Sequence, residues 1–257
     1  MPRSPDELRA LVEDALDRLE LWPQLHGQAE SVRYSIAVGG KRVRPVICLA
    51  TAEAAGAGLE DALAAACALE LVHTFSLVHD DLPALDDDEE RRGRPSTWKE
   101  YGEAVGVLAG DALLAEAFRL ATSYDTPLVA RELAGATLGM IGGQYLDVTA
   151  SAADEATLHR LKTGCLFDAA VGLALWVARV PETEQVSWRA FGAELGLLFQ
   201  IVDDILDGDG YVVTHGVDGA RRLADDAADR ARVRLGEVAA DTSVLREIVD
   251  GLAVRTA

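Results

Sequence analysis

The chain has 257 residues, with 24 Lys+Arg against 43 Asp+Glu and a formal net charge of −19. Hydrophobic residues make up 49% and charged residues 26%, which is a globular composition. Binding to nucleic acid or to an anionic membrane surface needs a basic patch, so the charge argues against both partners. The acid is either a solvated surface or is concentrated where a cation must be held.

The N-terminal sequence and the cysteines give the first structural expectations. Ser4 and Glu7 have the spacing of a capping box, which predicts a helix start. The three cysteines, Cys48, Cys67 and Cys165, are odd in number and lack metal-type spacing, so we expect free thiols in a reducing compartment. No uninterrupted apolar run reaches the ~18 residues of a membrane span, so we expect a cytoplasmic protein without stable membrane insertion.

Helical periodicity extends over most of the chain, and strand signals are nearly absent. Gly, Pro and Asp clusters predict breaks at 39–40, 56–59, 82–97, 124–127, 150–153, 179–181 and 208–218. We expect an all-α fold with a single domain over residues 1–257. The expected helices are 5–20, 60–81, 103–123, 127–149, 154–178, 182–206, 219–238 and 242–254.

An acidic segment follows one of the most apolar helices. Residues 80–90 read DDLPALDDDEE, in which seven of eleven are acidic. Adjacent carboxylates at the end of a buried helix repel one another and oppose the helix dipole, unless a cation is present. A solvated acidic loop is the ordinary interpretation of such a segment taken alone.

A second acidic segment favours the cation. Residues 199–207 read FQIVDDILD, where Asp203 and Asp204 share a helix face with Asp207, and Gln200 lies one turn back. Two aspartate-rich segments at the ends of two buried helices can face each other across a cavity. Clustered oxygen ligands favour Mg²⁺, which bridges carboxylates to substrate phosphates.

Three compact basic groups are candidates for binding those phosphates. They are GGKRVRP (39–45), RRGRP (91–95) and KTG (162–164), and they contain two of the only three lysines. Arginine suits bidentate phosphate binding and lysine supplies a point charge. Each group alone is compatible with ordinary surface charge.

With these motifs the chain resembles the trans-isoprenyl diphosphate synthases, or polyprenyl synthetases, from about Ser31 to about Asp207. Residues 80–86 (DDLPALD) match the first aspartate-rich motif of that family, and residues 203–207 (DDILD) match the second. GGKRVRP, LVHTFSLVHDD, RRGRP, LAGDALL (108–114), GGQYLD (142–147) and KTG match as well. The similarity is greatest to bacterial short-chain farnesyl and geranylgeranyl diphosphate synthases.

The resemblance implies an isoprenoid synthase helical bundle with a central active-site cavity. It also implies Mg²⁺-dependent, head-to-tail condensation of isopentenyl diphosphate with an allylic diphosphate (dimethylallyl or geranyl). Two to three Mg²⁺ ions would be held mainly by Asp80, Asp86 and Asp203, with support from Asp81, Asp204 and Asp207. Asp80, Asp81, Asp86, Lys162 and Asp203 are the expected catalytic residues.

The same resemblance assigns the two diphosphates to separate groups of side chains. Isopentenyl diphosphate would be held by Lys41, Arg44, His73 and Arg92. The allylic diphosphate would be held by Arg91, Lys162, Thr163 and Gln200. His79 matches a common family residue, and we assign it no ligand role.

Product length is expected to depend on Phe75 and Ser76, five and four residues before the first aspartate. Five residues on a helix span ~7.5 Å, a little more than one isoprene unit. A phenyl ring there would end the pocket early, as in bacterial farnesyl diphosphate synthases. We therefore expect farnesyl diphosphate, with a geranylgeranyl or geranyl diphosphate synthase as the alternative.

The chain departs from the family after its second motif. GDGYVVTHGVD (208–218) leads straight into the next helix, and no lysine follows Lys162. In the family a lysine from that region helps to hold the allylic diphosphate; Arg221 and Arg222 are the only nearby replacements, on a helix expected at the surface. A weakly active or non-catalytic subunit of a heteromeric synthase and a class I terpene cyclase stay open as alternatives. The family also implies a homodimer.

Overall fold

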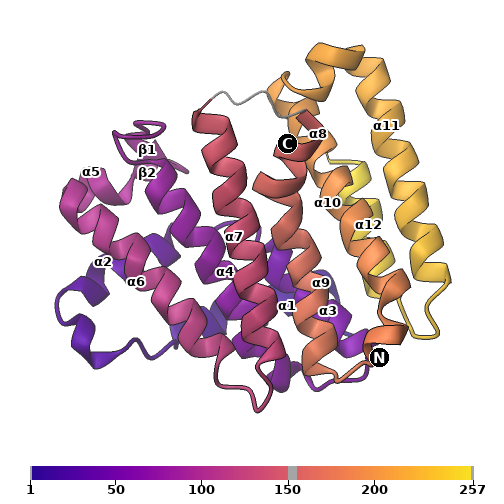
Figure 1. Ribbon diagram of the computed structural model, residues 1–257, viewed down its shortest axis with the longest axis horizontal. Helices are drawn as coiled ribbons and strands as arrows, with labels where there is room; N and C mark the ends of the chain where they lie inside the picture. Colours follow the sequence, from indigo (N-terminus) through magenta and orange to yellow (C-terminus); the bar gives the residue numbers. More distant parts are fainter. Residues whose placement is uncertain (1, 150–154, 256–257) are drawn as a thin grey trace.

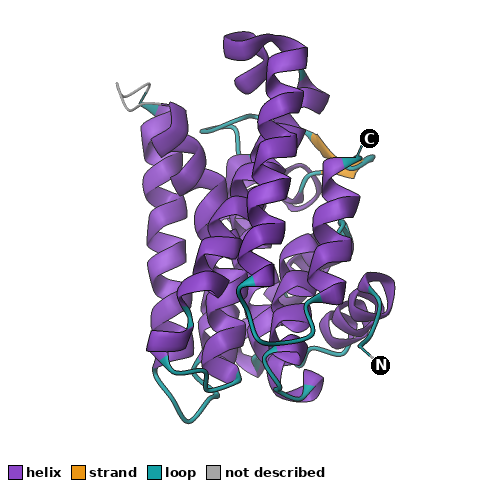
Figure 2. Cartoon of the chain, turned by 90° about the vertical axis from the view of Figure 1, so that its right-hand side faces the viewer, coloured by secondary structure: helices purple, strands orange, loops and turns teal. Residues whose placement is uncertain are grey.

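The protein is a bundle of helices in a computed structural model that describes residues 2–149 and 155–255. Figure 1 shows long helices running side by side, and Figure 2 shows helix in nearly every part of the chain drawn there. The α-helices are α1 (Pro5–Asp17), α2 (Gln28–Ala37), α3 (Val43–Ala54), α4 (Leu59–Asp80), α5 (Thr97–Tyr101), α6 (Glu103–Ala121), α7 (Leu128–Val148), α8 (Glu155–His159), α9 (Cys165–Val177), α10 (Val186–Asp207), α11 (Tyr211–Gly236) and α12 (Ser243–Ala253).

Short elements complete the chain. Two 3-10 turns cover Pro23–Leu25 (η1) and Glu182–Glu184 (η3), and a π-helix (η2) covers Arg160–Gly164. Strands β1 (Glu90–Arg91) and β2 (Arg94–Pro95) form a two-residue antiparallel hairpin. In Figures 1 and 2 the hairpin and the C-terminus both lie toward the upper end of the bundle. The expectation of an all-α fold is confirmed.

The core lies around α4 and α9, whose apolar residues are buried on more than one face. Small side chains let neighbouring helices pack closely against α4 and α9. Ala65, Ala66 and Ala68 of α4 are fully buried, as is Ala170 of α9. A helix that is apolar all round is stable only inside a bundle. The two central helices therefore hold their ends, and the side chains there, in fixed positions.

Local expectations at the N-terminus and at the cysteines are confirmed. The Glu7 backbone N–H donates to Ser4 Oγ over 3.3 Å, and the Ser4 N–H donates to the Glu7 carboxylate over 2.8 Å, which is a complete capping box. Cys48, Cys67 and Cys165 are free thiols.

The expected break at 208–218 is present but shorter, since only residues 208–210 separate α10 from α11. Helix α11 begins at Tyr211, and only a kink at Gly216 (φ 70°) interrupts it before the expected helix at 219–238. Helices α2, α3 and α5 are additional to the expected ones, and α2 and α3 lie on either side of the expected break at Gly39 and Gly40. The expected break at 150–153 lies outside the described residues.

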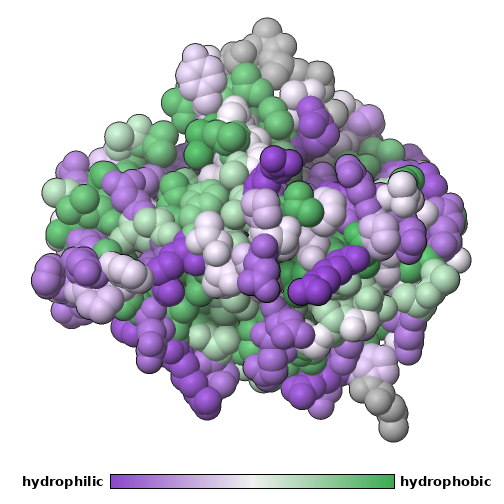
Figure 3. Space-filling model, turned by 60° about the horizontal axis from the view of Figure 1, so that its bottom comes forward, coloured by the Kyte–Doolittle hydropathy of each residue, from purple (hydrophilic) through white to green (hydrophobic). Residues whose placement is uncertain are grey.

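Helix α4 is the one helix of the described chain that is long and apolar enough to cross a membrane by length and composition. Of its most apolar window, 67% is buried within the protein, as expected of a core helix. Apolar side chains also reach the surface, and Figure 3 shows green areas among the hydrophilic side chains of the face it presents. Leu138 and Tyr145 of α7 are 71% and 66% exposed.

A cluster of hydrogen-bonded polar side chains lies between α7, α9 and α10, away from the aspartate-rich segments. Arg189 donates two hydrogen bonds to Glu132 (2.9 and 3.1 Å), and Trp176 Nε1 donates a third to the same carboxylate over 2.9 Å. Nearby, the buried Oδ1 of Asp168 has no hydrogen-bond partner among the described residues. Burial, with a further contribution from Glu132, raises the pKa of Asp168 to about 6.

We predict that Asp168→Asn stabilises the protein at neutral pH. The pKa of Asp168 is higher in the folded protein than its ordinary value of 3.8. Below pH ~3.8 the side chain is protonated in both the folded and the unfolded state, so it costs no stability. As the pH rises through about 6 the buried carboxylate becomes charged, and the folded state loses stability. The substitution should therefore raise the free energy of unfolding by roughly 1–3 kcal/mol at pH 7.5 and by little at pH 4.5. Urea unfolding at the two pH values measures this, with the exposed Asp125→Asn as control. An equal gain at both pH values would contradict it.

Candidate active site

Two adjoining cavities lie between the ends of α4, α10 and η2. The apolar cavity, about 460 Å³, is lined by Phe75, Met140, Ile141, Leu166 and neighbouring side chains. The basic cavity, about 560 Å³, is lined by a different set that includes Lys41, Arg92 and Asp203. Four residues line both cavities and join them: Arg44, His73, Leu77 and Thr163. A ligand with a charged head and an apolar tail can therefore span the pair.

The first aspartate-rich segment begins where α4 ends. Asp80 is the last residue of α4 and lines the apolar cavity, and its backbone carbonyl accepts a hydrogen bond from the Asp86 N–H over 2.9 Å. Burial raises the pKa of Asp80 to about 6; Asp86 adds to the increase, and Lys162 opposes it. Asp86 itself is exposed. The loop thus folds back so that both residues are near one another at the mouth of the cavity.

Asp81 lies differently from Asp80. It is 2% exposed, and Arg91 of β1 binds its carboxylate through Nε, at 2.7 and 3.0 Å, and through Nη2. Arg91 also contacts Asp88 over 3.4 Å. Burial raises the pKa of Asp81 although Arg91 opposes the increase. Arg91, expected at the allylic diphosphate, is therefore occupied by a carboxylate in this structure.

The second segment also divides its aspartates. Asp203 lines the basic cavity, and burial together with Asp207 raises its pKa. Asp204 is 3% exposed: it accepts a hydrogen bond from Gln200 Nε2 over 2.6 Å and another from the Tyr211 N–H over 2.9 Å. Asp207 is exposed. Asp204 thus holds the short connection between α10 and α11, and Gln200, one turn earlier on α10, orients its carboxylate.

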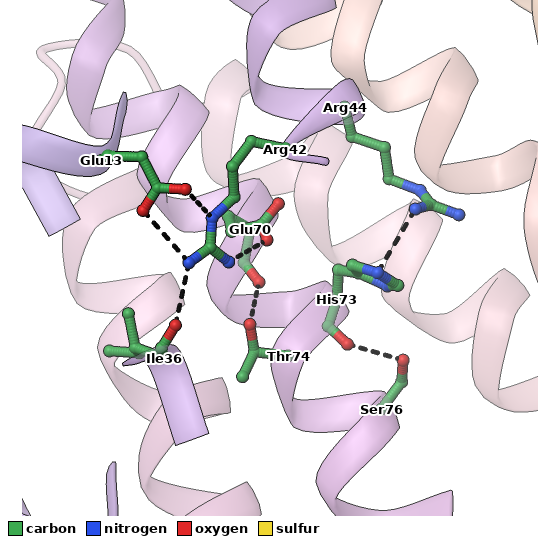
Figure 4. A network of polar contacts seen from close by, with 8 residues as sticks. All are labelled: Glu13, Ile36, Arg42, Arg44, Glu70, His73, Thr74 and Ser76. Atoms are coloured by element: carbon green, nitrogen blue, oxygen red, sulfur yellow. Dashed lines mark hydrogen bonds and ion pairs between the residues drawn. The ribbon is translucent and has the colours of Figure 1, made fainter. Parts of the chain in front are cut away.

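The expected basic residues Arg44 and His73 lie together between the two cavities. Arg44 Nη1 is 3.4 Å from His73 Nε2, as Figure 4 shows, and the guanidinium lies 4.7 Å from the centre of the Phe167 ring. Burial lowers the pKa of Arg44 to about 10, so it stays charged. Burial, with Arg44 and other arginines nearby, lowers the pKa of His73 well below its usual range. His73 is therefore neutral.

Arg42 stands between two cationic neighbours but has a structural role. Its backbone is left-handed (φ 49°), and its guanidinium donates to Glu70 (2.6 Å), Glu13 (3.0 Å) and the Ile36 carbonyl (2.8 Å). Figure 4 shows Arg42 directed toward α1 and α4, apart from Arg44. Removing one partner of a buried pair costs about 3–5 kcal/mol. This ion pair fixes the start of α3, which carries Arg44.

Lys162 and Thr163 lie on the π-helix η2, a distortion that is frequent at functional sites. Lys162 lines the apolar cavity and pairs with Asp147 of α7. Gly143 of α7 makes this possible, because a Cβ there would lie 2.5 Å from the Lys162 backbone nitrogen and 2.8 Å from its Cα. The glycine lets η2 approach α7 closely.

Lys41 and Arg92 both line the basic cavity. The family resemblance implies that these two residues bind the same diphosphate. The guanidinium of Arg92 lies against Gly40, where a Cβ would be 2.6 Å from Nη1. Desolvation lowers the pKa of Lys41, and Arg255 and Arg92 add to this effect.

Arg255 and Phe199 are site residues that the sequence did not reveal. Arg255 lines the basic cavity, with Nη1 3.6 Å from Asp203 Oδ1 and its guanidinium 5.8 Å from the Phe199 ring centre. No motif surrounds Arg255, so only the folded position of the chain end shows its proximity. Arg221 and Arg222 are exposed, as the sequence indicated.

The expected metal site can be tested by its donors. Among the described residues, no three His, Cys, Asp or Glu side chains are close enough to hold an ion by themselves. The available donors are carboxylate oxygens, and burial raises the pKa values of Asp80, Asp81 and Asp203, so a cation would stabilise their charged forms. Mg²⁺ binds through few carboxylates and completes its shell with water and phosphate oxygens, so the residues fit this ion together with a diphosphate.

Comparison with known proteins identifies the family of the chain. A model of the polyprenyl synthetase family matches residues 27–218. The geranylgeranyl diphosphate synthase of Cyanophora paradoxa is 41% identical over 216 residues, covering 78% of this chain and 72% of that protein. The farnesyl diphosphate synthase of Bacillus subtilis is 35% identical over 260 residues, covering 88% of each. The crystal structure of an FPP/GFPP synthase from Zymomonas mobilis has a TM-score of 0.85 at 30% identity and covers 97% of both chains.

With relatives that are farnesyl and geranylgeranyl diphosphate synthases over most of its length, the protein is a prenyltransferase. The chain belongs to the polyprenyl synthetase family.

Proposed function

We propose that the chain condenses isopentenyl diphosphate head-to-tail with dimethylallyl or geranyl diphosphate, and that residues 1–257 act as one catalytic domain. One observation carries this: Asp80 and Asp203 line two adjoining cavities that share Arg44, His73 and Thr163. The apolar cavity suits the allylic hydrocarbon tail, and the basic cavity suits the second diphosphate.

The basic cavity would bind isopentenyl diphosphate through Lys41, Arg44 and Arg92. Lysine and arginine supply complementary forms of phosphate binding, as a point charge and a bidentate fork. His73 is neutral and lines both cavities, so it would orient a phosphate by hydrogen bonding without adding charge. Arg255 adds a cation in a chain that lacks the family's later lysine.

The allylic diphosphate would lie near Lys162 and Thr163, with its tail in the apolar cavity. Two to three Mg²⁺ ions would be held mainly by Asp80, Asp86 and Asp203, with support from Asp207. When bound, Mg²⁺ neutralises charge on the departing diphosphate. Asp81 and Asp204 would act through Arg91 and Gln200, which they bind in the structure. The apolar walls exclude water from the allylic cation.

The proposed product is farnesyl diphosphate. Phe75 and Ser76 line the apolar cavity beside Met140, and the Phe75 side chain is 6% exposed. The Bacillus subtilis relative carries the farnesyl name, and it matches this chain over nearly its full length. Relatives named for geranylgeranyl diphosphate keep a longer product as the alternative.

A homodimer in the cytoplasm is proposed as the working form. Exposed apolar residues of α6 and α7 provide the face: Val107, Leu108, Leu138, Ile141, Tyr145 and Val148 are 42–71% exposed. Stable interfaces bury about 800 Å² per partner, and a face of this kind can contribute area of that order. Ile141, Tyr145 and Val148 also line the apolar cavity, so a second copy would cover its exposed side.

We predict that the purified chain sediments as a dimer and that Leu138→Arg shifts it to monomer, because a charge would be buried at the interface. Val213→Arg, at a 78% exposed position on α11, is the control and should leave the dimer intact. Analytical ultracentrifugation measures both. A monomeric wild-type chain would contradict the homodimer.

We predict that the pure protein with Mg²⁺, isopentenyl diphosphate and an allylic primer forms prenyl diphosphates, and that chelation with EDTA stops the reaction. Asp80→Asn should lower the rate at least about 100-fold through loss of metal affinity. Asp87→Asn, an exposed residue in the same acidic segment, is the control. Product analysis decides: cyclic hydrocarbons made without isopentenyl diphosphate would indicate a cyclase, and no turnover at all would indicate a non-catalytic subunit.

Phe75→Ala should lengthen the main product by at least one isoprene unit, because it removes a ring that lines the apolar cavity. Sizing the products by chromatography measures this. Phe118→Ala, a half-buried phenylalanine on α6 outside the cavity lining, is the matched control. An unchanged product length would exclude Phe75 as the residue that ends the cavity.

A further inference from the structure

His79 forms a layer between Phe75 and helix α6. Its ring meets the Phe75 ring edge-on, with centroids 5.2 Å apart and an interplanar angle of 80°. On the other side, His79 Nε2 is 3.0 Å from the Val107 carbonyl oxygen of α6. A carbonyl oxygen only accepts, so Nε2 carries the hydrogen and donates it. This bond fixes the orientation of the imidazole against Phe75.

Gly110 of α6 provides the space that the imidazole occupies. A Cβ at Gly110 would lie 2.9 Å from His79 Cε1 and closer still to Nε2 and Cδ2. Any side chain there must therefore push the ring away from α6, toward Phe75. Gly110 does not line the apolar cavity, whereas His79 and Phe75 both do.

The arrangement is thus a stack of α6 backbone, imidazole, phenyl ring and cavity. The tail of the growing product would meet the phenyl ring from the cavity side, and the imidazole contacts both that ring and the Val107 carbonyl of α6. We propose that His79 is a length-determining residue, which holds Phe75 against the hydrocarbon tail, and that Gly110 positions it. This inference rests on the proposed function and deepens it, because it concerns which allylic chain lengths the site accepts.

The size of the effect follows from the ring contact. An edge-on aromatic pair contributes about 0.5–1.5 kcal/mol beyond its buried area. Losing it from the state that stops elongation would change the ratio of further condensation to release by roughly 2- to 10-fold.

The experiment is a double-mutant cycle with product length as the readout. His79→Ala should raise the ratio of twenty-carbon to fifteen-carbon product roughly 2- to 10-fold, because Phe75 can turn into the vacated space. Gly110→Ala should shift products toward ten carbons, because the imidazole moves toward the cavity. In the double variant the methyl group meets no ring, so the shortening by Gly110→Ala should disappear.

Gly106→Ala is the matched control on the same helix. A Cβ there meets Trp98 and Leu82 at 3.0–3.2 Å, and neither residue lines the apolar cavity. It should lower the melting temperature without changing the product ratio, which separates helix crowding from cavity shape. His79→Asn keeps an N–H donor but not the ring, so it should lengthen products even if His79→Ala folds poorly.

Two results would overturn the inference. One is a wild-type product ratio in both His79→Ala and His79→Asn; the other is a shortening by Gly110→Ala that persists when His79 is absent. A wild-type enzyme that does not condense the two diphosphates would instead reject the proposed function, so the two failures are distinguishable.

Discussion

The site depends on carboxylates held where water is scarce. Helix α4 is buried along most of its length, and it ends at Asp80 and Asp81, where its own dipole is negative. Burial raises the pKa of both aspartates, and of Asp203 on the facing helix α10. An isolated cluster of this kind would be unstable as anions. The surrounding arginines and lysines supply positive charge that stabilises the carboxylates, and Mg²⁺, which the donors fit, would supply more.

Positive charge is distributed around these carboxylates in two ways. Some cations are bound to partners that hold the fold, as Arg42 is to Glu70 and Arg91 to Asp81. Others line the cavities, as Lys41, Arg44 and Lys162 do. The short GGKRVRP motif contains both kinds: Arg42 also lines the basic cavity, but its guanidinium is bound by Glu13 and Glu70, whereas Arg44 lies beside His73. Equal charges one residue apart therefore contribute to stability or to binding, but not equally to both.

Much of the fold could be predicted from the sequence, because helical periodicity and the capping box at Ser4 are local properties. Helix α11 shows the limit: the glycines and aspartates of 208–218 indicate a loop, yet packing against α10 makes Tyr211 onward helical. At the site, aspartate spacing indicated which residues gather at one end of the bundle. It could not show that the Tyr211 N–H donates to Asp204, or that Arg255 returns to Asp203, since these contacts depend on how the chain folds after α10.

The pinned connection after the second aspartate segment has a consequence for the timing of the catalytic cycle. Asp204 of α10 accepts a hydrogen bond from the Tyr211 N–H at the start of α11, so the residues between the two helices form a short closed connection. Opening this connection to release a product would break that hydrogen bond. We expect product departure, often the slow step in such enzymes, to be set by other segments at that end of the bundle, such as the hairpin or the chain near Arg255.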